Sequence, residues 1–253
     1  KFGIPIDDSP AAYELAQQLE NIDVNGISCH IGSQLTEIEP FLDAMRKLRG
    51  LMKRLEKMGI HISYLNIGGG LGITYDDESP PHPSEYAAAL KKTLGANNAT
   101  LILEPGRAII GNAGILIARV LYTKSTSHKR FVIVDAGMND LIRPALYDSF
   151  HAVEPVELKR SEKVKADLVG PVCETGDFFA RNREMPSFQP GDLVAVMSAG
   201  AYGFAMASNY NSRPRPAEVM VRGSLFSVIR SRETYDDLVR GELIPEFLGD
   251  GAH

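Results

Sequence analysis

The chain has 253 residues, of which 44% are hydrophobic and 23% are charged, and its formal net charge is −5. This length can bury one large core or two medium ones, and the interspersed charges form no basic stripe, which argues against a nucleic-acid partner. The longest apolar stretch, residues 108–122, contains Asn112 and Arg119 and is too short to span a bilayer, so we expect no membrane partner.

The two cysteines of the chain, Cys29 and Cys173, are too few for a disulfide framework. They predict a reducing compartment, the cytoplasm, where a free thiol can be structural or catalytic. The sequence has neither a Cys-x-x-Cys nor a His-x-x-x-His spacing, and we therefore expect no metal site. The chain begins with Lys1 instead of Met, and we expect its natural N-terminus to be missing.

The first part of the chain is predicted to alternate between strands and helices. Apolar residues recur at helical spacing after Ser9-Pro10 and from Phe41 to Leu55, with Gly59 at a position typical of a C-terminal cap. A third helix is predicted over 84–94, closed by Gly95, and strands are predicted over 23–30, 60–67 and 100–103. This alternation indicates parallel strands with crossover helices. Three strands cannot close a (β/α)8 barrel, so we expect the remaining strands to come from sequence that this chain lacks.

After Arg107 the pattern changes to short strands rich in branched residues, separated by turns. It predicts an antiparallel β domain that ends in a short helix from Ser231 to about Arg240. We place the domain boundary near residues 107–111, with a partial (β/α)8 barrel over 1–108 and a β-sandwich-like or barrel-like domain over 109–253. The expected strands of this domain are 115–122, 131–135, 153–158, 164–169, 193–197, 218–222 and 225–229.

Polar and glycine residues stand at the end of each predicted parallel strand. His30 and Ser33 follow the first strand, Gly68-Gly69-Gly70 the second and Glu104-Pro105-Gly106-Arg107 the third. Active sites of (β/α)8 barrels lie at this end of the strands. The glycine run lacks the Gly-Lys-Ser/Thr of a phosphate loop, and Ile73 stands where a dinucleotide motif needs its third glycine. The run can bind an anion through backbone N–H groups or form a plain tight turn, and taken alone the turn is favoured.

The other candidate residues are ambiguous one by one. His30 suits stacking on a ring with Ser33 at a phosphate, but a lone histidine is usually a core or surface residue. Segment 173–177 is either a catalytic thiol with two acids or a buried cysteine beside a turn. Glu104 and Arg107 can be a surface ion pair at a turn. Arg143, Tyr147 and the glycine-flanked Tyr202 can reach a ligand or simply belong to turns.

Six segments taken together favour the functional interpretations. They are His30-Ile31-Gly32-Ser33-Gln34, Gly68-Gly69-Gly70-Leu71-Gly72, Glu104-Pro105-Gly106-Arg107, Cys173-Glu174-Thr175-Gly176-Asp177, Gly200-Ala201-Tyr202-Gly203 and Asn209-Tyr210-Asn211-Ser212-Arg213-Pro214. With these segments in this order over nearly its whole length, the chain resembles the diaminopimelate decarboxylase family. That family belongs to the alanine-racemase-like class of enzymes that depend on pyridoxal 5′-phosphate.

The resemblance implies a role for each candidate residue. His30 would stack on the pyridine ring of the cofactor, and Glu104 would keep the pyridine nitrogen protonated so that the ring accepts electrons as CO2 leaves. Cys173 would return the proton, so Cys173 and His30 are the expected catalytic residues. The cofactor phosphate and the substrate beside it would contact Ser33, Gly68, Gly69, Gly70, Pro105, Gly106, Arg107 and Tyr202. The substrate would be held by Arg107, Arg143, Tyr147, Glu174 and Tyr202.

The implied reaction removes CO2 from the D-centre of meso-2,6-diaminopimelate and gives L-lysine, in the last step of lysine biosynthesis. In the family the Cys-Glu pair reaches the neighbouring subunit's site, which implies a homodimer with shared active sites. An alternative is a decarboxylase for ornithine, arginine or a carboxylated polyamine, but Arg143 and Glu174 suit a distal amino acid with both charges. A racemase would need an acid–base pair different from Cys173 and Glu174.

One departure from the family concerns its cofactor lysine, which lies in a Tyr-Ala-x-Lys motif on an early barrel strand. No lysine of this chain has that context, and Lys53, Lys57, Lys91 and Lys92 lie on amphipathic helices where a solvated face is expected. Lys1 matches a non-catalytic family position. We therefore expect the chain by itself to be inactive, and an inactive homologue that binds pyridoxal phosphate is the alternative from another functional class.

Overall fold

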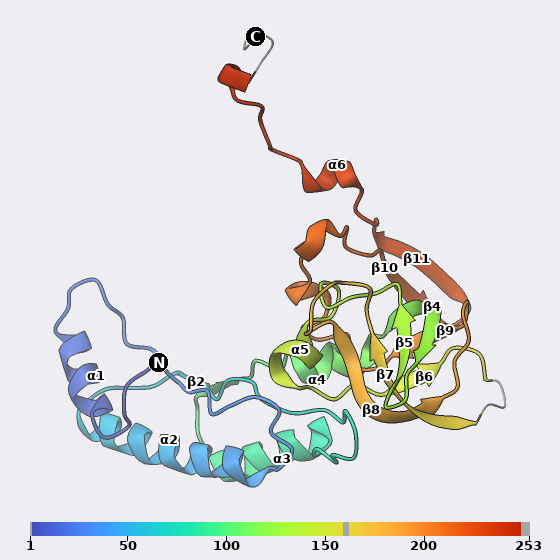
Figure 1. Cartoon of the computed structure of the whole chain (residues 1–253). Coiled ribbons are helices and arrows are strands. Elements are labelled where there is room, and N and C mark those ends of the chain that lie inside the picture. The colour runs from blue at the N-terminus through green and yellow to red at the C-terminus, as the bar shows by residue number, and fades with distance from the viewer. Residues whose placement is uncertain (1, 159–161, 249–253) are drawn as a thin grey trace. The chain divides into compact units, whose positions relative to one another are not determined.

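The computed structural model describes residues 2–158 and 162–248. The chain divides into two compact units, Lys1–Gly114 and Ile115–His253, which we call the barrel unit and the sheet unit (Figure 1). Within the described residues, none of the helices combines the length and the apolar character that crossing a membrane requires.

The barrel unit contains a three-stranded parallel sheet in the order β1-β2-β3. Its strands are β1 (Gly26–Ser28), β2 (Tyr64–Asn66) and β3 (Thr100–Ile102), each shorter than the sequence predicts. Its helices are α1 (Ser9–Gln17), α2 (Glu39–Lys57), α3 (Pro83–Leu94) and the single turn α4 (Arg107–Ile110). The alternation of parallel strands with crossover helices is confirmed.

Helix α2 forms because its apolar side chains recur every three or four residues and so make one continuous face. That face is buried together with β2 and α3, through Phe41, Met45, Leu48, Leu51, Leu55, Leu65 and Leu90. Gly59 and Gly95, which follow α2 and α3, have φ values of 79° and 68°. Glycine adopts this left-handed region at little cost, so it ends both helices as predicted.

The sheet unit contains a six-stranded sheet in the order β6-β9-β4-β5-β7-β8 and a separate hairpin of β10 and β11. The larger sheet consists of β4 (Leu116–Ser125), β5 (Arg130–Val134), β6 (Val153–Pro155), β7 (Lys163–Val169), β8 (Phe178–Pro186) and β9 (Leu193–Val196). The hairpin consists of β10 (Glu218–Arg222) and β11 (Leu225–Arg230). Every predicted strand of the domain is therefore present, most with altered ends.

The sheet unit departs from the prediction in its pairing and in two elements. Strand β5 pairs with β7 in parallel, so the expectation of a purely antiparallel domain is wrong at this pair. A parallel pair needs a crossover connection, and the connection here includes the short helix α5 (Arg143–Tyr147). The terminal helix α6 spans only Tyr235–Leu238, because the side chain of Thr234 accepts the N–H of Asp237 and so begins the helix there.

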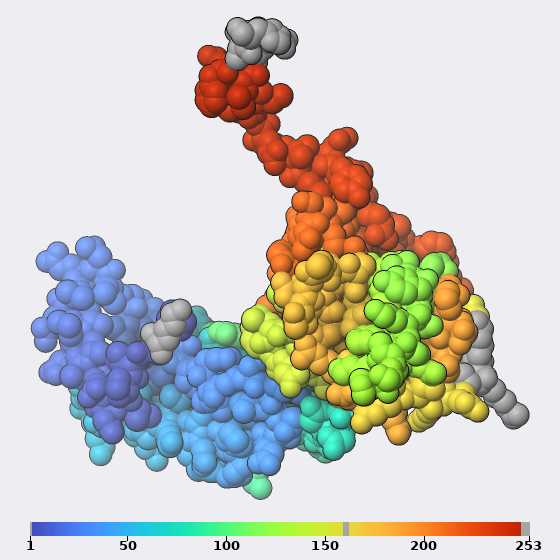
Figure 2. Space-filling view, viewed as in Figure 1, coloured from blue at the N-terminus to red at the C-terminus, as the bar shows by residue number. Residues whose placement is uncertain are grey.

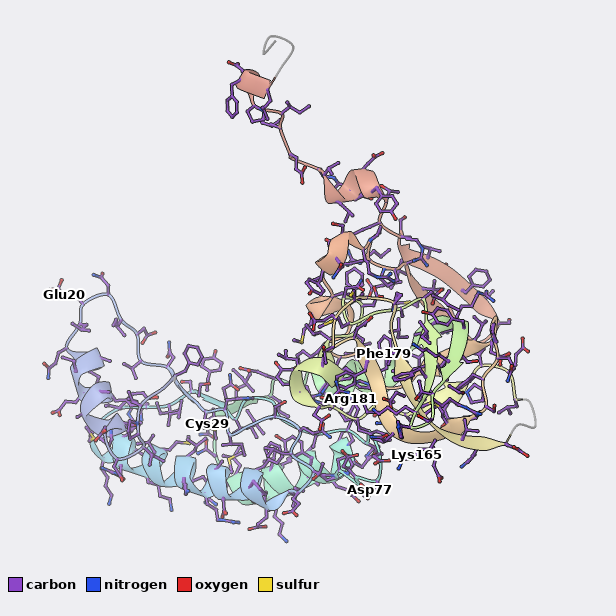
Figure 3. All side chains as sticks on the ribbon, in the orientation of Figure 1. Glu20, Cys29, Asp77, Lys165, Phe179 and Arg181 are labelled. Atoms are coloured by element: carbon purple, nitrogen blue, oxygen red, sulfur yellow. The ribbon has the colours of Figure 1, made fainter. Side chains whose placement is uncertain are left out.

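Strand β8 was not predicted, because the residues at its centre lack the apolar alternation that indicates a strand. Residues 181–184 are polar, and Asn182 among them has a left-handed φ of 50°, which coincides with the irregular register between β7 and β8. Phe179 of this strand is fully buried in the core, whereas the guanidinium of Arg181 lies over the ring of Phe178 at 3.5 Å from its centroid (Figure 3).

The core of the sheet unit lies on one side of β4. Ala118 and Val120 are 2% and 1% exposed, whereas Ile117 before them and Leu121 after them are 52% and 44% exposed. This alternation is what a strand with one buried face requires. The exposed face of β4 belongs to the green surface that the space-filling view presents (Figure 2).

Candidate active site

The ends of the three parallel strands bring the candidate residues of the barrel unit into contact. His30 stands two residues after β1, Gly68 two residues after β2 and Glu104 two residues after β3. The N–H of Glu104 donates to the carbonyl oxygen of Gly68 across 2.9 Å. A Cβ built on Gly68 would lie 2.9 Å from Nδ1 of His30. The three strand ends therefore form one continuous surface, on which the roles of these residues stay predictions.

The glycine run is packed too closely against both neighbouring loops to carry side chains. A Cβ on Gly69 would lie 2.3 Å from the carbonyl oxygen of Glu104, and a Cβ on Gly70 would lie 2.4 Å from that of Gly32. Gly68 and Gly70 also have φ values of 71° and 101°. Within the described residues, the N–H groups of Gly69 and Gly70 donate to no protein acceptor. This geometry leaves backbone donors available to an anion such as a phosphate.

We expect Gly69→Ala to destabilise the protein by about 1–3 kcal/mol, because the added methyl group forces the backbone of Glu104 to move. The matched control is Gly50→Ala on α2, where a Cβ would meet nothing within 4 Å. That control should stabilise the protein by about 0.5–1 kcal/mol, because alanine favours a helix interior over glycine. Urea unfolding of the two variants measures both effects, and equal shifts would contradict the close packing of Gly69.

The carboxylate of Glu104 is exposed and is held from one side by Asn66, the last residue of β2. Nδ2 of Asn66 donates to Oε1 of Glu104 across 2.6 Å, and the N–H of Gly68 donates to Oδ1 of Asn66 across 2.8 Å. Asn66 belongs to none of the six segments that carry the family resemblance. Its position at a strand end just before the glycine run was the signal that could have identified it.

Arg107 is the first residue of α4, and its side chain connects the third strand end to the loop after β1. Its guanidinium donates to the hydroxyl of Tyr75 across 2.5 Å and to Oγ of Ser33 across 3.1 Å. The guanidinium carbon also lies 5.6 Å from the centroid of the Tyr75 ring. Ser33 and Arg107 thus lie side by side, as a shared binding role requires. Tyr75 belongs to no motif, so the sequence gives no signal for it.

In the sheet unit, Cys173 lies exposed on the turn between β7 and β8. The turn is anchored by Asp177, whose buried carboxylate accepts the N–H groups of Val172 and Met138 across 2.6 Å each. Burial raises the pKa of the Asp177 carboxyl, and the two hydrogen bonds oppose that rise. A buried acid therefore fixes the turn, while the thiol of Cys173 points away from the core of its own unit. The interpretation of Cys173 as a buried residue does not hold in this unit.

Glu174, beside the thiol, is hydrogen-bonded by Tyr210. The Tyr210 hydroxyl donates to Oε2 of Glu174 across 3.1 Å. The N–H of Gly176 and this hydroxyl lower the pKa of the Glu174 carboxyl, and the same hydrogen bond raises the pKa of Tyr210. Glu174 is therefore ionised at neutral pH and can bind an ammonium group. Tyr210 lies in segment 209–214 of the resemblance but has no role assigned there.

Arg143 begins helix α5 and is only 6% exposed. Its guanidinium lies 3.3 Å from Nε2 of His151, a fully buried histidine whose Nδ1 lies 2.8 Å from the carbonyl oxygen of Met197. A carbonyl oxygen only accepts, so Nδ1 carries the proton and Nε2 accepts from Arg143. His151 therefore holds one side of the guanidinium, although it belongs to none of the six segments that carry the family resemblance. Tyr147, at the end of α5, is exposed.

Tyr202 is held outward by a strained turn that packs on the segment leading to α5. Its φ is 58°, in the left-handed region that is uncommon for residues other than glycine, and its side chain is exposed. A Cβ on the following Gly203 would lie 2.2 Å from the carbonyl oxygen of Ala199 and 3.8 Å from Cδ1 of Leu141. The Cys173 turn reaches the same region, because a Cβ on Gly176 would lie 3.7 Å from that of Ala145 in α5.

The candidate residues thus form two groups, one at the strand ends of the barrel unit and one around α5 of the sheet unit. Within the described parts of the chain, no three His, Cys, Asp or Glu side chains lie close enough together to bind a metal ion. The strand ends of the barrel unit instead offer backbone donors, a carboxylate and a guanidinium group. The group around α5 offers a guanidinium and a carboxylate.

Comparison with known proteins identifies the family. Residues 13–200, well over half of the chain, match the family described as pyridoxal-dependent decarboxylase, C-terminal sheet domain. The chain belongs to the pyridoxal-dependent decarboxylases. The resemblance, the fold class and pyridoxal phosphate as cofactor, all expected from the sequence, are confirmed at the level of this family.

Its relatives include proteins named diaminopimelate decarboxylase. The one from Pseudomonas aeruginosa is 52% identical over 247 residues, which cover 97% of this chain and 59% of the relative. Solved structures of diaminopimelate decarboxylase in complex with L-lysine include that of M. jannaschii, with 39% identity, a TM-score of 0.93 and coverage of 98% of this chain and 59% of the other. The structure from Helicobacter pylori has 40% identity, a TM-score of 0.88 and coverage of 94% and 59%. The chain therefore spans about three fifths of the length of these relatives.

The strand ends of this pyridoxal-dependent decarboxylase chain fit the family's cofactor. The closely packed glycines present backbone donors to a phosphate group, and Glu104 presents an exposed carboxylate on the same surface. His30 follows the edge strand β1, on the other side of the glycine run, and is exposed where an imidazole can stack on an aromatic ring. In the sheet unit, Tyr202 and Arg143 carry the groups expected to contact phosphate and carboxylate.

Proposed function

We propose that the protein to which this chain belongs removes CO2 from the D-centre of meso-2,6-diaminopimelate and releases L-lysine. The observation that supports this most is the 52% identity, over 97% of the chain, with a relative named diaminopimelate decarboxylase. The two relatives solved with L-lysine support the same product. The chain spans 59% of the length of its relative, so the activity is proposed for the whole protein.

The residues of the barrel unit would hold the cofactor. When bound, pyridoxal phosphate supplies an electron-accepting ring that stabilises the charge left behind by departing CO2. Ser33, the N–H groups of the glycine run and Gly106 would bind its phosphate, and His30 would stack on the ring. Glu104 would accept a hydrogen bond from the protonated pyridine nitrogen, and its negative charge would keep the ring cationic.

The residues of the sheet unit would hold the substrate and complete the reaction. Diaminopimelate carries an amino acid at its far end, with one positive and one negative charge. The ionised Glu174 suits the distal ammonium group, and the guanidinium of Arg143 suits the distal carboxylate. This pairing favours diaminopimelate over ornithine or arginine, whose distal groups are only basic. Cys173 would donate the proton that replaces CO2.

We further propose a homodimer in which Cys173 and Glu174 serve the neighbouring subunit's site, and a cytoplasmic location. The first proposal draws on the exposure of the Cys173 turn, which presents the thiol away from its own core. The second draws on the two free cysteines and the missing disulfide framework.

The test is CO2 release by the purified intact protein supplied with pyridoxal phosphate. We expect release from meso-diaminopimelate with L-lysine as the product, and little release from ornithine or arginine. Borohydride treatment followed by mass spectrometry would identify the lysine that binds the cofactor, expected in a Tyr-Ala-x-Lys motif. Cofactor binding without CO2 release from any of these substrates would support the inactive homologue instead.

A further inference from the structure

We propose that Asn66 is a positioning residue that fixes the Glu104 carboxylate for its contact with the pyridine nitrogen of the cofactor. The inference rests on the proposed role of Glu104 and adds a residue that no motif of the chain identifies. It is argued from three hydrogen bonds that link the ends of β2 and β3.

The three hydrogen bonds close a ring. The N–H of Gly68 donates to Oδ1 of Asn66 across 2.8 Å, and Nδ2 of Asn66 donates to Oε1 of Glu104 across 2.6 Å. The N–H of Glu104 in turn donates to the carbonyl oxygen of Gly68 across 2.9 Å. Each of the three residues thus donates once and accepts once, and the ring joins Asn66 to Glu104, which lies 38 positions later in the sequence.

The ring also determines which way the Asn66 amide points. A backbone N–H can only donate, so the atom facing Gly68 must be the oxygen, and the nitrogen must face the carboxylate. The amide cannot rotate to present its oxygen to Glu104 without losing both bonds. The Asn66 amide is therefore held in one orientation by the glycine loop, with its nitrogen donating to Glu104.

This arrangement occupies one carboxylate oxygen and leaves the other for a ligand. Oε1 accepts from Asn66, while Glu104 as a whole remains exposed at the strand ends. A pyridinium N–H needs an acceptor held in a fixed direction, so Asn66 supplies the orientation that the contact requires.

The test compares Asn66→Asp with Asn66→Ala in the intact protein. Asn66→Asp keeps an acceptor for the Gly68 N–H but replaces the donor with a second carboxylate beside Glu104. The matched control is Asn97→Asp, an exposed site whose side-chain oxygen accepts the N–H of Ala99 across 2.6 Å and can still do so as aspartate. The readouts are the dissociation constant of pyridoxal phosphate, its dependence on pH, and the NMR signal of the Asn66 side-chain amide without cofactor.

We expect both Asn66 variants to bind pyridoxal phosphate about tenfold more weakly or worse, because a hydrogen bond to a charged group is lost. In Asn66→Asp alone, the acidic limb of the pH profile should move to higher pH, because two adjacent carboxylates retain a shared proton. Asn97→Asp should change neither property. In the cofactor-free protein, Glu104→Gln should move the amide signal of Asn66 and leave that of Asn97 in place.

An Asn66→Asp variant with unchanged cofactor affinity and an unmoved acidic limb would overturn the inference. If Glu104→Gln nevertheless weakened cofactor binding, the proposed function would stand without it. An intact wild-type protein that failed to bind pyridoxal phosphate would overturn both. Thermal unfolding of the variants identifies a general loss of structure, and an Asn66 amide signal insensitive to Glu104→Gln counts against the inference in every case.

Discussion

Replacing Cys173 with alanine is expected to lower kcat for CO2 release with L-lysine formation by about 10²–10⁴-fold, the usual contribution of a positioned proton donor. The carbon that loses CO2 must gain a proton, and Cys173 is the exposed thiol on a turn that the buried Asp177 anchors. Its removal deletes the donor without disturbing that anchor. The measurement is steady-state turnover of meso-diaminopimelate by the holoenzyme.

The matched control is Cys29→Ala, the other cysteine, which lies half-buried just after β1 (Figure 3). Burial raises the pKa of the Cys29 thiol, so it stays neutral and acts as a small apolar side chain. Its replacement should leave turnover unchanged. Equal losses in the two variants, or full activity in Cys173→Ala, would contradict the role of Cys173.

Replacing Glu104 with glutamine is expected to lower kcat by about 10²–10³-fold, comparable to the loss of one preorganised electrostatic contact in an active site. The amide has nearly the shape of the carboxylate but no charge, so it cannot keep the pyridine nitrogen protonated. The exposed Glu20→Gln, in the turn after α1, removes the same charge away from the strand ends (Figure 3). It should keep wild-type turnover, measured with saturating cofactor.

The same two variants test whether active sites are shared. If Cys173 serves the partner's Glu104, a dimer of one Cys173→Ala subunit and one Glu104→Gln subunit has one intact site. Random mixing should then restore roughly one quarter of wild-type activity from two inactive variants. A mixture no more active than either variant alone would show that each site uses residues of one subunit.

The barrel unit was largely predictable because its signals are local. The spacing of Phe41, Met45 and Leu48 in sequence is enough to place helix α2, and Gly59 marks its end through a backbone angle that glycine alone adopts easily. The strand ends followed from the same alternation. The structure differs from the prediction in the unpredicted turn of helix α4 and in the lengths of the strands. The strand lengths differ because the hydrogen bonds between strands decide where pairing stops.

The sheet unit was less predictable because its pairing depends on distant segments. Nothing in the sequence of β5 reveals that it lies parallel to β7, which the crossover through α5 decides. Strand β8 carries polar residues and the left-handed Asn182 at its centre, so its local pattern argues against a strand. Its buried Phe179 and its pairing with β7 outweigh that local preference.

The sequence by itself therefore determined the family, the cofactor and the residues that end each strand, because motif order and helical spacing are properties of neighbouring residues. Only the tertiary structure decided which donors and acceptors form hydrogen bonds with the site residues. Asn66 meets Glu104 across 38 residues of sequence, and Met138 meets Asp177 across 39. Such partners are selected by how the chain packs, since a hydrogen bond forms wherever folding brings donor and acceptor within reach.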